Sequence, residues 1–318
     1  GARAIASGRL PVRVLALMAV MLVSSFGFAN AQAVNDPGAD ISVAHPAFAQ
    51  NAGPVVAVDS GHNNYHTIAG RYEPFASLLR NDGFQVVDSG SAFTKDSLSP
   101  FRVLVISNAL PAALVKDWKL PATSAFSAAE IDALKAWVGG GGSLLLIADH
   151  LPFAGSARDL AQAFGFQFED GVVARDPLSG RPDMFSKADG SLRDDVVTRG
   201  RNASEAITSL RTFTGSAFRA PPSARPVLVF PAGYMIHQCG LPCPPGVPEQ
   251  DATGYLQGAV MPFGKGRIAV FGEAAMFSAQ VIASVNPPFR FGFGAEGAEQ
   301  NKPFILNLMH WLAGLLPR

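Results

Sequence analysis

Polar side chains that can bind ligands or carry protons gather in one short stretch of the sequence, residues 59–66. This stretch contains one acid, two histidines and two asparagines, which are Asp59, His62, His66, Asn63 and Asn64. Such groups are costly to bury unless each finds a partner. Imidazole and carboxylate groups are ligands of first-row divalent metals, and histidine is the side chain that exchanges protons near neutral pH. The stretch is therefore the first candidate for a functional site.

Three interpretations of residues 59–66 stay open. The stretch could help to form a divalent-metal site, with His62, His66 and Asp149 as ligands, and a divalent metal is the one cofactor that the sequence suggests. It could instead form a metal-free catalytic or ligand-binding site. It could also be a polar loop whose side chains bond the backbone and cap the next helix. The four-residue spacing of the two histidines brings them onto one face only if the stretch is helical.

Three later apolar runs, at residues 103–107, 144–148 and 267–271, also end in polar side chains. The residues that follow these runs are Asn108, Asp149, His150 and Glu273. Ligands of open α/β sheets bind beyond the carboxyl ends of the parallel strands. We therefore expect these residues to converge with the stretch 59–66 at one edge of a sheet.

This convergence predicts a role for each polar side chain. The catalytic candidates are Asp59, His62, His66, Asp149, His150 and Glu273, and the candidates for ligand contacts are Asn63, Asn64 and Asn108. In an enzyme, His62 or His150 would carry the proton, with Asp59 and Glu273 orienting that histidine or holding a metal. The alternative roles are structural. Asp149 would cap a turn, His150 would pack under Phe153, and Glu273 would stand where a helix dipole favours an acid.

Strand and helix patterns alternate along the chain from residue 54. Short apolar runs predict strands at residues 54–59, 84–87, 103–107, 144–148, 227–230, 258–261 and 267–271. Apolar stripes predict helices that begin near residue 72, at Ser127, at Ser156 and near residue 301. Ser127 and Glu130 have the spacing of a capping box. Alternation of this kind predicts an α/β fold with a doubly wound, mostly parallel sheet.

The N-terminal part of the chain differs from the rest in composition. Residues 1–33 have the basic start, uncharged apolar run and small final residues of a secretory signal peptide. An uncleaved membrane anchor is the alternative, but the apolar run is shorter than the roughly 20 residues that span a bilayer. Residues 34–53 are predicted to be a tether, and residues 54–318 a single domain with a loop-rich insertion at about 170–257. We expect a periplasmic or secreted protein with no membrane span after leader cleavage.

The two cysteines, Cys239 and Cys243, stand close together in a proline-rich stretch. In an oxidising compartment such a pair is expected to form a disulfide. A redox or zinc role is the alternative, with His237 the only adjacent further ligand. The charge of the chain is balanced, with 25 basic and 25 acidic residues and no basic run. Nucleic acid and anionic membrane surfaces are therefore excluded as expected partners, and a small polar ligand is favoured.

Two segments of the chain resemble the class I glutamine amidotransferase-like superfamily. The first is residues 134–150, where a helix, a glycine-rich turn and an apolar strand lead to a histidine-bearing end. The second is residues 264–273, together with the terminal stretch 307–312, which is similar to secreted and transport-associated branches and to trehalose-utilisation-type proteins. The resemblance covers residues 54–165 and 258–315 and implies a flavodoxin-like three-layer sandwich. Amidotransferases of this superfamily carry a nucleophilic cysteine where this chain has Asp149 and His150, so thiolate chemistry is disfavoured.

The sequence favours two alternative functions. The first is an exported domain with a rebuilt Asp/His/Glu site that binds a small polar ligand such as a sugar derivative. In an enzymatic version, this site would also hydrolyse the ligand. The choice of a sugar is based on analogy of fold. The second is a non-catalytic binding or assembly domain of an envelope complex, with residues 170–257 as its recognition surface. An enzyme should show a concave pocket with converging polar groups, and a binding module an exposed apolar patch.

Overall fold

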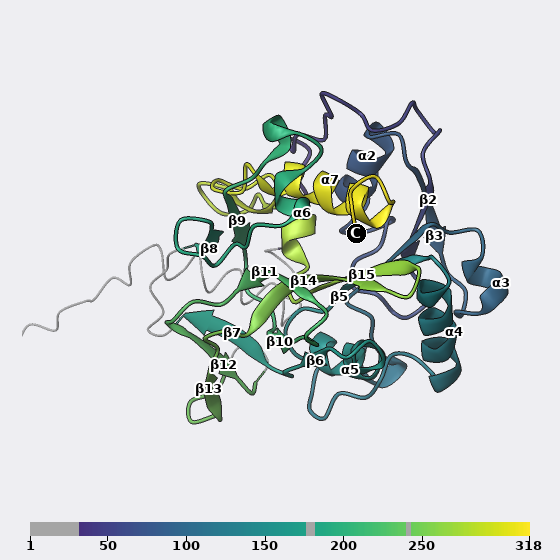
Figure 1. The fold of residues 1–318 in the computed structure, drawn as a ribbon. Helices are drawn as coiled ribbons and strands as arrows, with labels where there is room; N and C mark the ends of the chain where they lie inside the picture. Colours follow the sequence, from purple (N-terminus) through teal and green to yellow (C-terminus); the bar gives the residue numbers. More distant parts are fainter. Residues whose placement is uncertain (1–31, 176–181, 240–242) are drawn as a thin grey trace, which may run out of the picture.

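The computed structural model describes residues 32–175, 182–239 and 243–318. Within them, a nine-stranded sheet forms the centre of the molecule (Figure 1). Five strands are parallel to one another, in the order β3 (Gln85–Ser89), β2 (Val55–Asp59), β4 (Val103–Ser107), β5 (Ser143–Ile147) and β15 (Gly266–Phe271). Antiparallel strands extend this sheet beyond β15, namely β14 (Leu256–Phe263), β11 (Arg225–Val229), β10 (Phe218–Arg219) and β6 (Gln167–Phe168).

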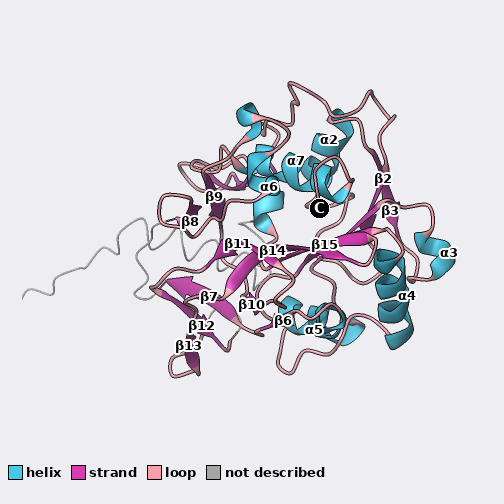
Figure 2. Cartoon of the chain, in the orientation of Figure 1, coloured by secondary structure: helices cyan, strands magenta, loops and turns pink. Residues whose placement is uncertain are grey.

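The central strands are buried on both faces because helices cover both sides of the sheet. Every residue of β4 and β5 is buried, which is typical of parallel strands with near-continuous apolar sequences. Helices α2 (Glu73–Asn81) and α7 (Asn301–Leu312) pack on one face, and α4 (Ala128–Gly139) and α5 (Phe153–Ala163) pack on the other (Figure 2). Successive residues of a strand point to opposite faces of the sheet. Val105 packs in the core on the side of α2 and α7, and Leu104 and Ile106 pack in the core on the side of α4 and α5.

Most of the predicted core elements match observed ones, with differences at their ends. The capping box at the start of α4 is present: Ser127 Oγ accepts from the backbone N–H of Glu130 at 3.2 Å, and Glu130 Oε2 accepts from the backbone N–H of Ser127 at 2.9 Å. The predicted start of α5 at Ser156 is wrong, because the helix begins at Phe153, directly after Pro152. Ser156 is fully buried in the first turns of this helix.

Smaller antiparallel sheets flank the central one. One contains β7 (Val172–Arg175), β12 (Tyr234–His237) and β13 (Glu249–Asp251), and another contains β8 (Asp183–Ser186) and β9 (Ser209–Thr212). A third contains β1 (Val34–Asn35), β16 (Ala279–Ile282) and β17 (Phe289–Gly292). The short helical segments are α3 (Lys95–Leu98), α6 (Val196–Arg199), η1 (Ala112–Leu114), η2 (Ala203–Glu205) and η3 (Ala275–Phe277). The predicted insertion at 170–257 thus contributes β10, β11 and the first two residues of β14 to the central sheet.

The observed fold class is mixed α/β, with a mostly parallel central sheet and flanking antiparallel sheets. The predicted α/β class is confirmed to this extent. Helices are few, so the chain matches a doubly wound sandwich only loosely. The expected disulfide between Cys239 and Cys243 is present, with a Cα–Cα distance of 5.4 Å. It lies against Val172 of β7.

The predicted signal peptide, residues 1–33, lies outside the described residues except for its last two positions. In the part of the chain that the structure describes, no helix is long and apolar enough to cross a bilayer.

The segment predicted to be a tether, residues 34–53, lies against the domain. Its start pairs with β16 as strand β1. Further along, the Phe48 ring packs edge-on against Phe84, with 5.2 Å between ring centroids. The backbone N–H groups of Ala47 and Phe48 donate to the side chain and the carbonyl of Asp82, at 2.8 and 3.1 Å. Because these contacts reach the end of α2, residues 34–53 are part of the folded unit.

Replacing Phe48 with alanine tests whether this segment contributes to stability. We expect Phe48→Ala to lower the free energy of unfolding by about 1–3 kcal/mol, because a half-buried ring and its contact with Phe84 are lost. Urea denaturation of the full chain measures the change. Gln50→Ala, in the same segment but exposed, is the matched control and should have almost no effect. Equal stability of the two variants would mean that the segment is only a tether.

Candidate functional site

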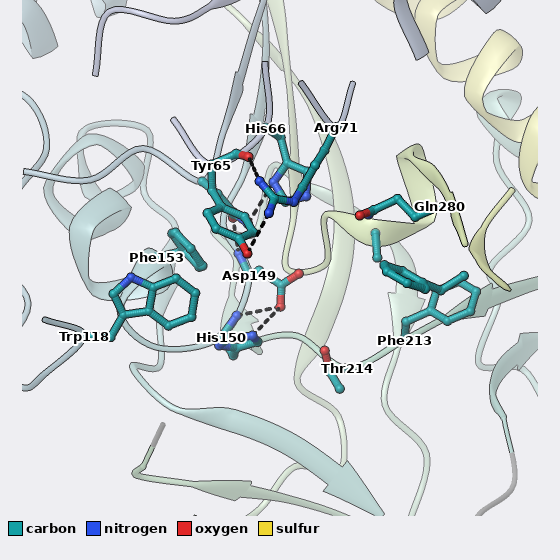
Figure 3. A pocket seen from close by; sticks show the side chains of 13 residues that line it. Tyr65, His66, Arg71, Trp118, Asp149, His150, Phe153, Phe213, Thr214 and Gln280 are labelled. Carbon is teal, nitrogen blue, oxygen red and sulfur yellow. Dashed lines mark hydrogen bonds and ion pairs between the residues drawn. The ribbon is translucent and has the colours of Figure 1, made fainter. Parts of the chain in front are cut away.

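A pocket opens at the carboxyl ends of β2, β4, β5 and β15 (Figure 3). It has about 530 Å³ of open space, counting its mouth. Its lining residues come from the loops after these strands and from segments beside them: Tyr65, His66, Arg71, Asn108, Trp118, Asp149, His150, Phe153, Phe213, Thr214, Ala275, Gln280 and Phe291. A concave site with a few polar groups among aromatic walls is the usual form of a small-ligand site.

Asn108 holds the polar floor of this pocket in place. Its side-chain oxygen accepts from the backbone N–H of Asp149 at 2.9 Å, and its side-chain nitrogen lies 3.2 Å from Nδ1 of His66. A backbone N–H can only donate, so the amide oxygen must face Asp149 and the amide N–H must face His66. Nδ1 of His66 is therefore an acceptor, and the proton of the neutral ring is on Nε2.

His150 has the opposite tautomer. Its Nδ1 lies 2.9 Å from the backbone oxygen of Leu151. A carbonyl oxygen can only accept, so this Nδ1 carries a proton, and Nε2 of the neutral ring is left with a free lone pair. Nε2 is 4.0 Å from a carboxylate oxygen of Asp149, outside hydrogen-bond range. One histidine of the pocket is thus a donor at Nε2, and the other is an acceptor at Nε2.

The surroundings of His66 keep its ring neutral. Burial lowers the pKa of His66 well below the usual value, and the positive charge of Arg71 lowers it further. Among the described residues, Nε2 of His66 has no hydrogen-bond partner. His66 is therefore a neutral N–H donor at neutral pH, on one side of Asp149, with His150 on the other (Figure 3).

The two acids beside the histidines are held by backbone N–H groups. The Asp149 oxygens accept from the N–H of His150 at 2.7 Å and of Ala274 at 3.0 Å. The Glu273 oxygens accept from the N–H of Ala275 at 2.7 Å and of Met276 at 2.8 Å, at the start of η3. Burial and the charge of Asp149 raise the pKa of Glu273 well above the usual range. Glu273 does not line the pocket, and its contacts are those of the structural alternative.

Asp59 and His62 form a separate charged cluster outside the pocket lining. Nδ1 of His62 lies 3.0 and 2.9 Å from the two oxygens of Asp59, and Nε2 lies 2.8 Å from Glu130. Asn64 donates to Asp59 at 2.9 Å. Burial alone would lower the pKa of His62, but the two carboxylates outweigh it and raise the pKa. We name Asp59, His62 and Glu130 the carboxylate–imidazolium clamp, which ties the end of β2 to the start of α4.

Only some of the candidate site residues predicted from the sequence therefore line the pocket. Four of the predicted residues line it, and these are His66, Asn108, Asp149 and His150. The others lie outside its lining, and these are Asp59, His62, Asn63, Asn64 and Glu273. Asn63 adopts the left-handed conformation at φ +49° and donates to the backbone oxygen of Leu110 at 3.1 Å, so it shapes the loop.

Several pocket residues were not predicted from the sequence. Tyr65 and Arg71 stand in or just after the polar stretch, so their proximity to His66 is a usable signal. Thr214 lines the opposite side with φ +150°, a conformation that is rare for a β-branched residue. Nothing in the local sequence marks Thr214, Gln280 or Phe291. Gln280 and Phe291 are paired across the antiparallel strands β16 and β17, and Thr214 lies in the loop after β9.

The proposed metal ligands His62, His66 and Asp149 are not brought together. Across the described residues, no three histidine, cysteine, aspartate or glutamate side chains are grouped so that they could hold one ion. Both ring nitrogens of His62 are instead bonded to carboxylates.

Comparisons with known proteins address the fold. No protein-family model matches the chain, and no curated protein matches it. Among solved structures, the mmIFT52 N-terminal domain is 14% identical with a TM-score of 0.57, over 82% of this chain and 97% of that one. A ThuA-like protein from Bacteroides uniformis is 10% identical with a TM-score of 0.42, over 87% and 95%. A cytoplasmic protein from Salmonella typhimurium is 10% identical with a TM-score of 0.47, over 83% and 100%. The first likeness shows a shared fold.

The tautomers of the pocket histidines can be measured directly. In long-range proton–nitrogen NMR spectra of the ¹⁵N-labelled chain, we expect His66 to be protonated at Nε2 and His150 at Nδ1. His66 should also stay neutral from about pH 8 to about pH 6, because its pKa is well below the reference value near 6.5. Asn108→Asp replaces the donor to His66 with an acceptor and should move the His66 proton to Nδ1. An unchanged His66 tautomer in this variant would contradict the role given to Asn108.

The carboxylate–imidazolium clamp predicts a pH dependence of stability. The pKa of His62 is raised on folding, so its contribution is complete below the unfolded value near 6.5 and is lost as pH rises through the folded pKa. His62→Gln should cost about 3 kcal/mol near pH 6, because it leaves Asp59 buried without its cation. The cost should shrink at alkaline pH. His45→Gln, at an exposed position, is the control, and a pH-independent cost of His62→Gln in urea titrations would rule out the charged clamp.

Proposed function

We propose that the pocket binds a small polar ligand such as a sugar derivative and hydrolyses an acyl ester that this ligand carries. The observation that supports this proposal is the pair of histidines on either side of Asp149, with the ring proton of His66 on Nε2 and a ring proton of His150 on Nδ1. One offers a lone pair to a water molecule and the other offers an N–H to a carbonyl oxygen. Both functions are needed for acyl transfer to water.

The walls of the pocket suit a ring with apolar faces and polar edges. Tyr65, Trp118 and Phe153 form one aromatic cluster, with ring centroids 5.0 to 5.7 Å apart. Phe213 and Phe291 form another, with centroids 6.4 Å apart. Figure 3 shows Phe213 across the pocket from the Trp118 cluster. A sugar ring has C–H faces that can pack on aromatic rings, and hydroxyl groups at its edges that the polar floor can bond.

The reaction follows from the two tautomers. Nε2 of His150 takes a proton from water, and the water oxygen forms a bond to the acyl carbon of the ligand. The N–H of His66 donates a hydrogen bond to the carbonyl oxygen while negative charge develops there. A neutral histidine in this role stabilises the oxyanion without giving up its proton. When the acyl–oxygen bond breaks, His150 returns its proton to the leaving alcohol oxygen, so ester and water give acid and alcohol.

We infer further that the domain works outside the cytoplasm and is related to the class I glutamine amidotransferase-like superfamily. The N-terminal signal-peptide pattern and the disulfide between Cys239 and Cys243 support export. The patterns at residues 134–150 and 264–273 support the superfamily. Few large apolar side chains are exposed in the described part of the chain, and these are Val34, Val87, Val115, Leu120 and Leu315. They favour a pocket-based function over an assembly surface.

Binding and hydrolysis are tested separately with one set of proteins. Calorimetry with a panel of monosaccharides should show binding to the wild-type chain, and pH-stat assays with O-acetylated sugars should show release of acid. His150→Gln removes the base and should lower kcat/KM by about 10²- to 10⁴-fold while ligand binding is largely kept. His237→Gln, a histidine outside the pocket, is the matched control. Equal activity of both variants would refute the role of His150, and failure of every sugar to bind would refute the ligand class.

A further inference from the structure

Arg71 is a cation of the pocket lining that has no carboxylate partner among the described residues. It lines the pocket together with Tyr65 and His66 (Figure 3). No acidic side chain in the described part of the chain lies within 4.0 Å of its guanidinium nitrogens. Charged side chains that are partly removed from water normally find an opposite charge, so the position of Arg71 calls for an explanation.

The guanidinium of Arg71 is fixed in place before any ligand arrives. Its Cζ atom lies over the Tyr65 ring, 3.8 Å from the ring centroid. Nη1 donates to the backbone oxygen of Tyr65 at 3.2 Å, and Nη2 donates to the Tyr65 hydroxyl at 3.0 Å. These two bonds use two of the five N–H groups of an arginine. The remaining three N–H groups have no partner in the described residues, so a rigid donor fork is left for a ligand.

The acids near Arg71 are already occupied. Both oxygens of Asp149 accept backbone N–H groups, and both oxygens of Glu273 do the same. The His66 ring between these groups and Arg71 is neutral, partly because of the Arg71 charge itself. The free N–H groups of Arg71 therefore have no anion to bond within the described chain.

We propose that Arg71 binds the carboxylate of an acidic ligand, so that the ligand class is a carboxylate-bearing sugar of the uronic-acid type. This inference rests on the proposed function, because it names the charge of a ligand for the same pocket. The planar fork of arginine matches a carboxylate with two parallel hydrogen bonds. Arg71 is the only lysine or arginine among the lining residues of this pocket, and a single cation balances a monoanionic carboxylate better than a dianionic phosphate.

Matched pairs of sugars separate the charge from the rest of the ligand. Calorimetry at low salt compares glucose with glucuronate, galactose with galacturonate, and glucuronate with glucose 6-phosphate. We expect the wild-type chain to bind a uronate about 10- to 100-fold more tightly than its neutral partner. Arg71→Gln should abolish this preference, so that a uronate and its neutral partner bind with similar affinity. Arg71→Lys keeps the charge but not the fork and should keep only part of the preference.

Two controls show whether a variant is still folded and whether the effect belongs to the pocket. Retained binding of the neutral sugar by Arg71→Gln shows an intact pocket, and Arg80→Gln, an exposed arginine of α2 outside the pocket, should keep the full preference. Tyr65→Phe removes the hydroxyl that anchors Arg71 and should weaken uronate binding selectively.

The outcomes that overturn the inference differ from those that overturn the proposed function. Equal binding of neutral and acidic sugars by the wild-type chain, or an unchanged preference in Arg71→Gln, overturns the inference and leaves the sugar site standing. Tighter binding of glucose 6-phosphate than of glucuronate overturns the assignment of a carboxylate. If no sugar of either charge binds, the proposed function and the inference both fail.

Discussion

The pocket depends on one hydrogen-bonded side chain, the amide of Asn108. This residue follows β4 in the left-handed conformation, at φ +50°. Its backbone N–H donates to Ile147 at the end of β5, and its carbonyl accepts from Tyr65 in the loop after β2, both at 3.0 Å. Its side chain joins the same two neighbours, through Asp149 and His66. The ends of three adjacent strands are thereby held in register, and the orientation of one amide fixes which ring nitrogen of His66 carries the proton.

The charged and ionisable side chains at the ends of the strands form two separate groups. The clamp uses two carboxylates to keep His62 positively charged on the side of α4. The pocket keeps His66 neutral through burial and the nearby charge of Arg71. The same residue type, four positions apart in one loop, thus has opposite protonation because of its neighbours. The charged ring of His62 serves stability, since it satisfies the buried Asp59, whereas the neutral ring of His66 keeps an N–H donor that no described residue uses.

The fold could be predicted from the sequence as far as it depends on local patterns. Uninterrupted apolar runs such as residues 144–148 identify buried parallel strands, and the spacing of Ser127 and Glu130 identifies the start of α4. The second use of Glu130 could not be predicted. One of its oxygens caps the helix while the other bonds His62, which is 68 positions away in the sequence. No local sequence pattern can predict a contact between residues that far apart in the chain. His62 is bonded to Glu130 and does not line the pocket.

The site was predictable where it is built by consecutive parallel strands, and not elsewhere. The rule that polar residues at carboxyl ends of parallel strands converge brings Asn108, Asp149 and His150 to one place. The rule does not predict which polar side chains will be hydrogen-bonded to backbone N–H groups instead, as both carboxylate oxygens of Glu273 are. It also does not reach the far wall with Phe213 and Gln280, which comes from the loop after β9 and from β16, in small antiparallel sheets separate from the central one. The loops after the parallel strands thus supply most of the polar groups of the pocket, and segments of the small antiparallel sheets form its far wall.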